Sequence, residues 1–395
     1  MCRIPSLSQR SQRPEDKLRS QTLALCFIAI SLAGCRNTPD PTPNYREYAY
    51  VSNGGSNSVT VIDLRALAIH STVPVGRGPT GLAVNPKKNE VYAVNTQSNN
   101  VSVIDAETNK VVSTIGVQSA PFFVDVSGDG RRAYVANSVS ANLSVIDLDQ
   151  RKVIKTVATG KGSNLARVTP DGKLVIVALH DENSVAVVDT DKLAVRNTVK
   201  VCEKPVELAV VPDSSKAFVA CSESHQVAVV DLKSDKLLTL LDVGKNPIHI
   251  VVKPDGGEAF VCNYDASSIS EVVTGTNEVN NTFMIGDHPV RALVSPDNAL
   301  LYVANFGSDS IAVYSIDSGK RTSSAPVGSH PDSMALSPNH MLLLVVNTAS
   351  SDLTVLSLID SRGRPQPELP TLETMIPLGN APRAIVVKAF VSQRP

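Results

Sequence analysis

The chain has 395 residues, of which 42% are hydrophobic and 19% charged, and its formal net charge is −1. This balance gives no electrostatic reason to expect nucleic acid as a general partner. Aromatic residues make up only 4% of the chain and tryptophan is absent. The core must therefore be built from Val, Ile, Leu and Ala, and abundant Val and Ile favour strands over helices.

The first 34 residues predict a lipoprotein signal peptide. Five basic residues lie within residues 1–20, a short apolar run follows at residues 23–30, and small residues come next. This order is typical of an export signal, and the run is shorter than the ~20 apolar residues that a membrane-spanning helix needs. The sequence LAGC at residues 32–35 resembles the bacterial lipobox, in which the cysteine, here Cys35, is acylated and becomes the mature N-terminus. An ordinary signal peptide with a chance cysteine is the alternative.

The lipobox implies an exported protein of the cell envelope, attached to the lipid bilayer through acylated Cys35. Arg36 follows the cysteine where retained lipoproteins carry Asp, so the resemblance implies an outer-membrane anchored or periplasm-facing protein. Residues 35–47 contain a Pro-rich stretch, which we interpret as a tether that holds the folded domain away from the lipid.

A unit of 42 residues recurs from residue 48 onward. Its clearest mark is the sequence Tyr-Val-Ser-Asn at residues 50–53, which has related copies at 92–95, 134–137, 260–263, 302–305 and 344–347 and degenerate copies starting at 176 and 218. Within each unit an alternating strand commonly ends in Asp, as at 101–105, and a third strand follows, as at 111–115. A Gly/Pro turn leads to a fourth strand, as at 82–84, which Pro-Asp-Gly-like turns close, as at 170–172. Four strands in 40–45 residues is the spacing of a propeller blade.

We count eight units and predict an all-β fold, a single β-propeller of eight four-stranded blades over residues 48–390. No unit holds a helical period for ten residues, which excludes helical repeats. The chain enters at the second strand of a blade, and residues 382–387 match a first strand. The C-terminal strand is therefore expected to complete the N-terminal blade and close the ring. The last unit has nine extra residues around 361–370, which are polar and Pro-rich and predict a loop.

The Tyr-Val-x-Asn, Val-x-Val-Ile-Asp and Pro-Asp-Gly elements resemble the YVTN-repeat family of bacterial propellers, relatives of the lactonase-like propellers. The resemblance covers residues 48–388. Those relatives commonly have seven blades, so seven is the alternative to our count. The repeated Asn and Asp are expected to be structural, because Asn can bond the backbone of its own turn and Asp can accept backbone N–H groups at a strand end.

Functional residues are expected where single units break the repeat. In a propeller the loops between strands two and three share a face with the loops between strand four and the next strand one. Five of the seven histidines fall on that face, over units four to eight: His180, His225, His249, His288 and His330. The same stretch holds Tyr264, Asp265, Phe306 and Asp332.

One repeat position near the channel mouth carries Glu207, His249 and Arg291 in three successive units. In the other units this position holds Gly81, Phe123, Leu165, Ser333 and Ala384. We predict that these three residues, together with the loop histidines, are the ligand-binding candidates. The alternative is that propeller loops are simply polar.

Motifs for catalysis, metal or cofactors are absent from the sequence: there is no Cys-x-x-Cys, Gly-x-Ser-x-Gly or phosphate-binding Gly-rich loop. We therefore predict no metal, no cofactor and no catalytic residue. Cys202 replaces a repeat Gly and Cys221 replaces a repeat Asn on the same face. In an oxidising compartment these two could form a disulfide, whereas the alternative is that they and Cys262 are small buried hydrophobes.

Two functions remain open. The first is a monomeric, non-enzymatic binding or scaffold protein that presents the loop face of units four to eight to a protein, glycan or small-molecule partner. The second, implied by the family resemblance, is an enzyme of the lactonase-like or cofactor-dependent oxidoreductase type with its site at the channel mouth. In that case Arg291 would hold an anion, and His249 or His288 would act as general base beside Glu207.

Overall fold

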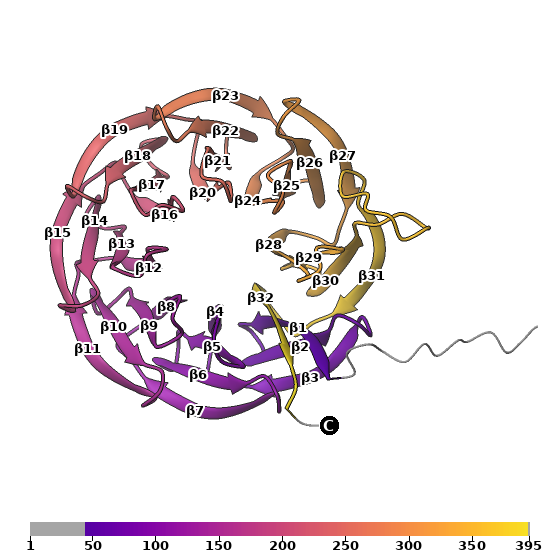
Figure 1. Ribbon diagram of the computed structural model, residues 1–395, viewed down its shortest axis with the longest axis horizontal. Coiled ribbons are helices and arrows are strands. Elements are labelled where there is room, and N and C mark those ends of the chain that lie inside the picture. Colours follow the sequence, from indigo (N-terminus) through magenta and orange to yellow (C-terminus); the bar gives the residue numbers. More distant parts are fainter. Residues whose placement is uncertain (1–43, 394–395) are drawn as a thin grey trace, which may run out of the picture. The chain divides into compact units, whose positions relative to one another are not determined.

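The computed structural model describes residues 44–393, and this part of the chain forms eight four-stranded antiparallel sheets arranged in a ring (Figure 1). The prediction of an all-β propeller with eight blades is confirmed, and the alternative count of seven is excluded. The predicted signal peptide and Cys35 lie outside the described residues. Within residues 44–393 there is no helix long and apolar enough to cross a membrane.

Each blade has an innermost strand beside the central channel and three strands further out. The innermost strands are β4 (Pro79–Val84), β8 (Pro121–Val126), β12 (Ser163–Val168), β16 (Pro205–Val210), β20 (Pro247–Val252), β24 (Pro289–Val294), β28 (Pro331–Leu336) and β32 (Pro382–Val391). The second strands are β1 (Tyr45–Asn53), β5 (Glu90–Asn95), β9 (Arg132–Asn137), β13 (Leu174–Leu179), β17 (Lys216–Cys221), β21 (Glu258–Asn263), β25 (Leu300–Asn305) and β29 (Leu342–Asn347).

The two outer strands of each blade complete the sheets. The third strands are β2 (Ser58–Asp63), β6 (Asn100–Asp105), β10 (Asn142–Asp147), β14 (Ser184–Asp189), β18 (Gln226–Asp231), β22 (Ser268–Val273), β26 (Ser310–Ser315) and β30 (Asp352–Ser357). The outermost strands are β3 (Ala68–Pro74), β7 (Lys110–Gly116), β11 (Lys152–Ala158), β15 (Ala194–Lys200), β19 (Lys236–Asp242), β23 (Glu278–Met284), β27 (Lys320–Pro326) and β31 (Thr371–Pro377).

The core lies between neighbouring blades. All six residues of β5 are buried, whereas the outermost strand β7 is mostly exposed or half-buried. Second strands have both faces covered by adjacent sheets, which explains their nearly continuous hydrophobic sequence. Because tryptophan is absent, the largest fully buried side chains include Tyr50 and Tyr92. The hydroxyl of Tyr50 donates to Asn109 Oδ1 at 2.7 Å, and that of Tyr92 to Glu90 Oε2 at 2.6 Å, so both polar ends are satisfied.

The ring is closed by the last strand, as predicted. β32 pairs with β1 from Tyr45↔Val391 to Asn53↔Pro382, and the sheet order of this blade is β3-β2-β1-β32. β1 begins at Tyr45, three residues before the predicted start of the propeller. In every blade the second strand is therefore paired, on the side that faces the channel, with an innermost strand of the same chain.

The repeated Asp and Asn form different kinds of hydrogen bond. Asp63 Oδ1 accepts the backbone N–H groups of Arg65 and Ala66 at 2.9 and 3.1 Å, as the sequence predicted. Asn53 behaves differently from the prediction, because its Nδ2 donates to Thr60 Oγ1 on the neighbouring strand β2 at 2.8 Å and to Ser58 Oγ at 3.2 Å. The Asn therefore bonds the second strand to the third in place of bonding its own turn.

The extra residues of the last unit form a loop between β30 and β31. Tyr302 donates its hydroxyl to the carbonyl of Pro367 at 3.2 Å, and Ser323 Oγ donates to the carbonyl of Glu368 at 2.6 Å. The loop therefore packs back onto the neighbouring blade, and it projects beside β27 and β31 in Figure 1.

Candidate functional site

A bulge at the start of each innermost strand positions the side chains of the predicted site. Pro205 pairs with Cys221 but Glu207 pairs with Ala220, so Val206 is an extra residue in β16. The same irregularity follows the first proline of β20 and of β24. Bulges re-aim the side chains that follow them. Here they bring the side chains of Glu207, His249 and Arg291 together across three neighbouring blades.

Glu207 lies between two guanidinium groups. Arg167 Nη2 on β12 is 3.3 Å from Glu207 Oε1, and Arg291 Nη1 is 3.6 Å from Glu207 Oε2. The guanidinium of Arg167 also lies over the ring of Phe123 at 4.3 Å, which holds it in place by a cation–π contact. The Glu207 side chain is only 10% exposed, whereas about a third of each arginine side chain remains exposed.

His249 is neutral in this cluster and both of its ring nitrogens are engaged. Nε2 is 3.1 Å from the carbonyl of Ala292, which can only accept, so Nε2 carries the proton. Nδ1 therefore accepts from Arg291 Nη1 at 3.1 Å, and it lies 3.7 Å from Glu207 Oε2 without donating to it. Burial and the positive charge of Arg291 lower the pKa of His249 below its usual value, against the opposing charge of Glu207.

The two carboxyl groups near Arg167 have pKa values that are shifted in opposite directions. Burial alone would raise the pKa of Glu207, but the charges of Arg167 and Arg291 outweigh it and lower that pKa to about 2. Burial raises the pKa of Asp125 on β8, although Arg167 and two backbone N–H groups oppose the shift. Two guanidinium groups and one carboxylate leave the cluster of Arg167, Glu207, His249 and Arg291 with an excess of one positive charge.

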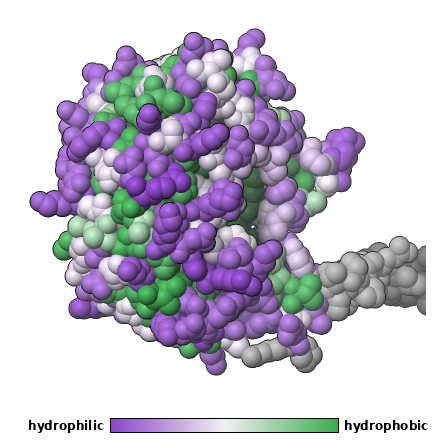
Figure 2. Space-filling view, turned by 60° about the vertical axis from the view of Figure 1, so that its left-hand side comes forward, coloured by the Kyte–Doolittle hydropathy of each residue, from purple (hydrophilic) through white to green (hydrophobic). Residues whose placement is uncertain are grey.

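The cluster borders two cavities in the channel. One, of about 490 Å³, is lined by Arg167, His249 and Arg291 and by apolar residues of β16, β20 and β24. The other, of about 340 Å³, is lined by the same two arginines and by residues of β4, β8, β28 and β32 that include Phe122 and Arg383. The oblique view in Figure 2 shows a hollow between polar side chains of the ring. A ligand entering the channel therefore meets the arginine pair.

The remaining histidines lie apart from this cluster. His180 Nδ1 is 2.9 Å from Asp181 Oδ1, and His225 Nδ1 is 3.1 Å from the carbonyl oxygen of Ser222, so each is held in its own loop. His288 and His330 pack against aromatic rings on the loop face. No group of three or more His, Cys, Asp or Glu side chains within residues 44–393 is arranged to hold a metal ion.

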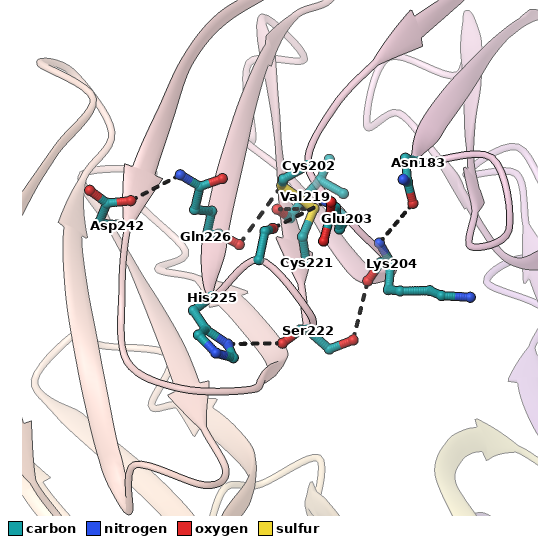
Figure 3. Close-up of a disulfide and its surroundings, with 11 residues drawn as sticks. Asn183, Cys202, Glu203, Lys204, Val219, Cys221, Ser222, His225, Gln226 and Asp242 are labelled. Atoms are coloured by element: carbon teal, nitrogen blue, oxygen red, sulfur yellow. Dashed lines mark hydrogen bonds between the residues drawn. A yellow bond between two sulfur atoms is a disulfide. The ribbon is translucent and has the colours of Figure 1, made fainter.

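The two cysteines at broken repeat positions form a disulfide. Cys202, in the loop after β15, is bonded to Cys221, at the end of β17, with a Cα–Cα distance of 5.7 Å. Figure 3 shows this bond beside His225, in the loops of the blade, so it does not belong to the arginine cluster. Cys262 is buried and free, and burial raises its pKa to about 12, which makes it an inert thiol.

Arg167 was missed by the sequence analysis, which compared the units at a single position of the innermost strand. Arg167 lies two residues further along that strand. The same repeat position holds Asp125 in the preceding blade and Ala, Val or Leu in the other six blades. Two successive units therefore carry a charged residue at a position that is otherwise apolar. These two charged residues become visible when the eight units are compared at every repeat position.

Comparisons with known proteins agree with this architecture. A family described as YNCE-like beta-propeller matches residues 86–164 and 133–370. No curated protein matches the chain. Among similar solved structures, the hydrazine synthase of Kuenenia stuttgartiensis has 21% identity and a TM-score of 0.57, and the match covers 71% of this chain and 95% of that chain. The dihydro-heme d1 dehydrogenase NirN in complex with DHE has 16% identity and a TM-score of 0.73, with 86% of this chain and 74% of that chain covered. A suggested 6-phosphogluconolactonase of Bacteroides fragilis has 16% identity and a TM-score of 0.61, with 89% of this chain and 99% of that chain covered. At these identities the likenesses show the fold alone.

Proposed function

The chain belongs to the YNCE-like β-propeller family, and from this premise and the charge in its channel we propose that it is a non-enzymatic binding protein whose ligand is a small anion. The carboxylate or phosphate of the ligand contacts the solvent-exposed parts of Arg167 and Arg291, in the cavity beside Glu207. The observation that carries the proposal is the pair of partly exposed guanidinium groups beside a 490 Å³ cavity, with a single carboxylate between them. A planar guanidinium group can direct two N–H donors at two oxygens of a carboxylate or phosphate.

The same contacts argue for binding over catalysis. A general base needs a free lone pair and a pKa near the working pH. Both nitrogens of His249 are already engaged, and Glu207 has a pKa of about 2 because it lies between two cations. Neither group in the cluster meets both requirements. The arginines, by contrast, are held in place by Phe123 and Glu207, which is the preorganisation that favours ligand binding.

The proposal is tested with acetate, citrate and inorganic phosphate as probes, in thermal-shift and calorimetric titrations at constant ionic strength. We expect citrate and phosphate to raise the Tm of the wild type. Arg291→Gln is expected to weaken their binding at least tenfold, whereas Arg362→Gln, in the exposed loop around 361–370, leaves it unchanged. The proposal fails if none of the three anions raises the Tm, or if both variants lose affinity equally.

The cell-envelope location is a second part of the proposal, and the LAGC sequence at residues 32–35 supports it. Acylation of Cys35 would hold the propeller at the membrane surface through its Pro-rich tether. Detergent-phase partitioning of protein expressed in a Gram-negative host provides the test. Wild type and Cys26→Ser are expected in the detergent phase and Cys35→Ser in the aqueous phase. Equal partitioning of Cys35→Ser and wild type would refute the anchor.

A further inference from the structure

A row of four aromatic rings lies on the loop face. Tyr264 and Phe306 directly follow β21 and β25, while His288 and His330 directly precede β24 and β28. The ring centroids are 4.5 Å apart for Tyr264 and His288, 6.3 Å for Tyr264 and Phe306, and 4.2 Å for Phe306 and His330. We call these four residues the aromatic row.

The aromatic row replaces small or polar residues of the repeat in two successive blades. The position of Tyr264 and Phe306 is held in the other units by Gly54, Thr96, Ser138, His180, Ser222 and Thr348. Tyr264 and Phe306 are half-buried and pack against the hydrophobic cluster between the blades β24–β27 and β28–β31, so the position of each ring is fixed. His288 is half-exposed and His330 exposed. The row is thus a rigid surface that solvent reaches.

The loops that carry the row are acidic. The segments 264–267, 285–288, 306–309 and 327–330 contain Asp265, Asp287 and Asp309 and no Lys or Arg. Asp287 Oδ1 is 2.9 Å from His288 Nδ1, and Asp309 Oδ1 accepts the backbone N–H of His330 at 2.8 Å. A Cβ atom at Gly307 would lie 2.5 Å from Asp287 Oδ2, so the glycine makes room for this carboxylate beside the rings.

We propose that the aromatic row is a docking surface for an extended basic segment of a partner protein. Carboxylates and aromatic faces together attract cationic side chains. Side chains at positions i and i+2 of an extended chain are about 6.6 Å apart, which matches the 6.3 Å between Tyr264 and Phe306. An Arg-x-Arg sequence can therefore direct one guanidinium to each ring. This site is separate from the anion site in the channel.

The test uses a fluorescent six-residue peptide of alternating Arg and Ser, and the same peptide with citrulline, the neutral analogue of arginine. In anisotropy titrations we expect the citrulline peptide to bind at least tenfold more weakly, and the affinity of the arginine peptide to fall as NaCl is added. Phe306→Leu keeps apolar bulk and removes the ring, and it should cost about two- to fivefold in affinity. Ser138→Ala, at the same repeat position of a blade far from the row, serves as the matched control.

Further variants separate this site from the rest of the molecule. Asp265→Asn changes an exposed side chain and should weaken peptide binding about twofold without changing the Tm. Arg291→Gln, which removes an arginine of the channel, should leave peptide binding unchanged. Equal binding of the arginine and citrulline peptides, or equal losses in Phe306→Leu and Ser138→Ala, would overturn the proposal. Tighter binding of neutral maltohexaose than of the arginine peptide would overturn it in favour of a saccharide.

Discussion

Restoring the repeat sequence at the disulfide should destabilise the protein, and it should do so least when three positions are changed together. In five other blades, a Gly in the loop after the outermost strand packs against the repeat Asn: a Cβ atom at Gly244 would lie 2.7 Å from Asn263, and one at Gly286 only 2.3 Å from Asn305. The blade of Asn137 differs, because Gln118 holds the Gly position there. Cys202 holds the Gly position and Cys221 the Asn position. Cys221→Asn alone therefore places an Asn against a Cβ for which the five blades with this Gly leave no room.

The expected magnitudes follow from the structure. The disulfide joins residues 19 apart in sequence, and losing such a cross-link costs about 3 kcal/mol, or about 4 °C in Tm for a domain of this length. The steric clash in Cys221→Asn adds about 1–3 kcal/mol. Cys202→Gly relieves that clash. Ala228→Ser then supplies the acceptor that Thr60 provides to Asn53 in the first blade, and it should recover about 1 kcal/mol.

Scanning calorimetry of the single, double and triple variants under non-reducing conditions measures this series. We expect the lowest Tm for Cys221→Asn, an intermediate value for Cys202→Gly/Cys221→Asn, and a higher value when Ala228→Ser is added. Ala228→Ser in the wild type is the control and should not be stabilising. If Cys221→Asn is as stable as the double variant, or if Ala228→Ser stabilises the wild type equally, the reasoning from the Gly–Asn pair is wrong.

Three further predictions concern the channel, the ring and the buried tyrosines. The lowered pKa of Glu207 means that its stabilising effect of about 3 kcal/mol is complete above pH ~4.5 and is lost as the pH falls towards 2. Glu207→Gln should therefore make the free energy of unfolding depend less on pH over that range. An unchanged pH dependence would contradict this. Truncation after Ala381 removes β32 and should abolish a cooperative melting transition, whereas removal of only the residues after β32 should not. Tyr92→Phe removes the donor to Glu90 Oε2, while Oε1 keeps its contact with Arg151, and it should cost about 1–3 kcal/mol in chemical denaturation. Tyr314→Phe should cost almost nothing, because that buried hydroxyl has no partner within residues 44–393, and equal losses in the two variants would refute the comparison.

The fold could be predicted because the 42-residue period fixes both the strand order and the blade count. Residues 382–387 repeat a first-strand pattern, and that pattern alone indicated how the ring closes. The contacts of the repeat Asn could not be predicted in the same way. Asn53 has its partners Ser58 and Thr60 within seven residues in sequence, but the choice between its own turn and the neighbouring strand depends on how the strands pair.

The candidate site was predictable in part, for a related reason. Glu207, His249 and Arg291 share one repeat position, so the period alone brings them to neighbouring blades. Arg167 lies at another position of its strand, and its approach to Glu207 depends on side-chain length and on the bulge in β16, which a sequence pattern does not contain. The neutral state of His249 likewise depends on the carbonyl of Ala292, a backbone group with no sequence signature.

The pairing of β1 with β32 determines when the molecule can finish folding. Tyr45 finds its partner Val391 only after almost the whole propeller sequence has been synthesised. Contacts between such distant residues slow folding, because a long stretch of chain must be ordered before they form. Until β32 arrives, β1 presents an unpaired edge that can capture a strand from another nascent chain. Substitutions in residues 382–391 should therefore increase aggregation during synthesis even where the finished protein tolerates them.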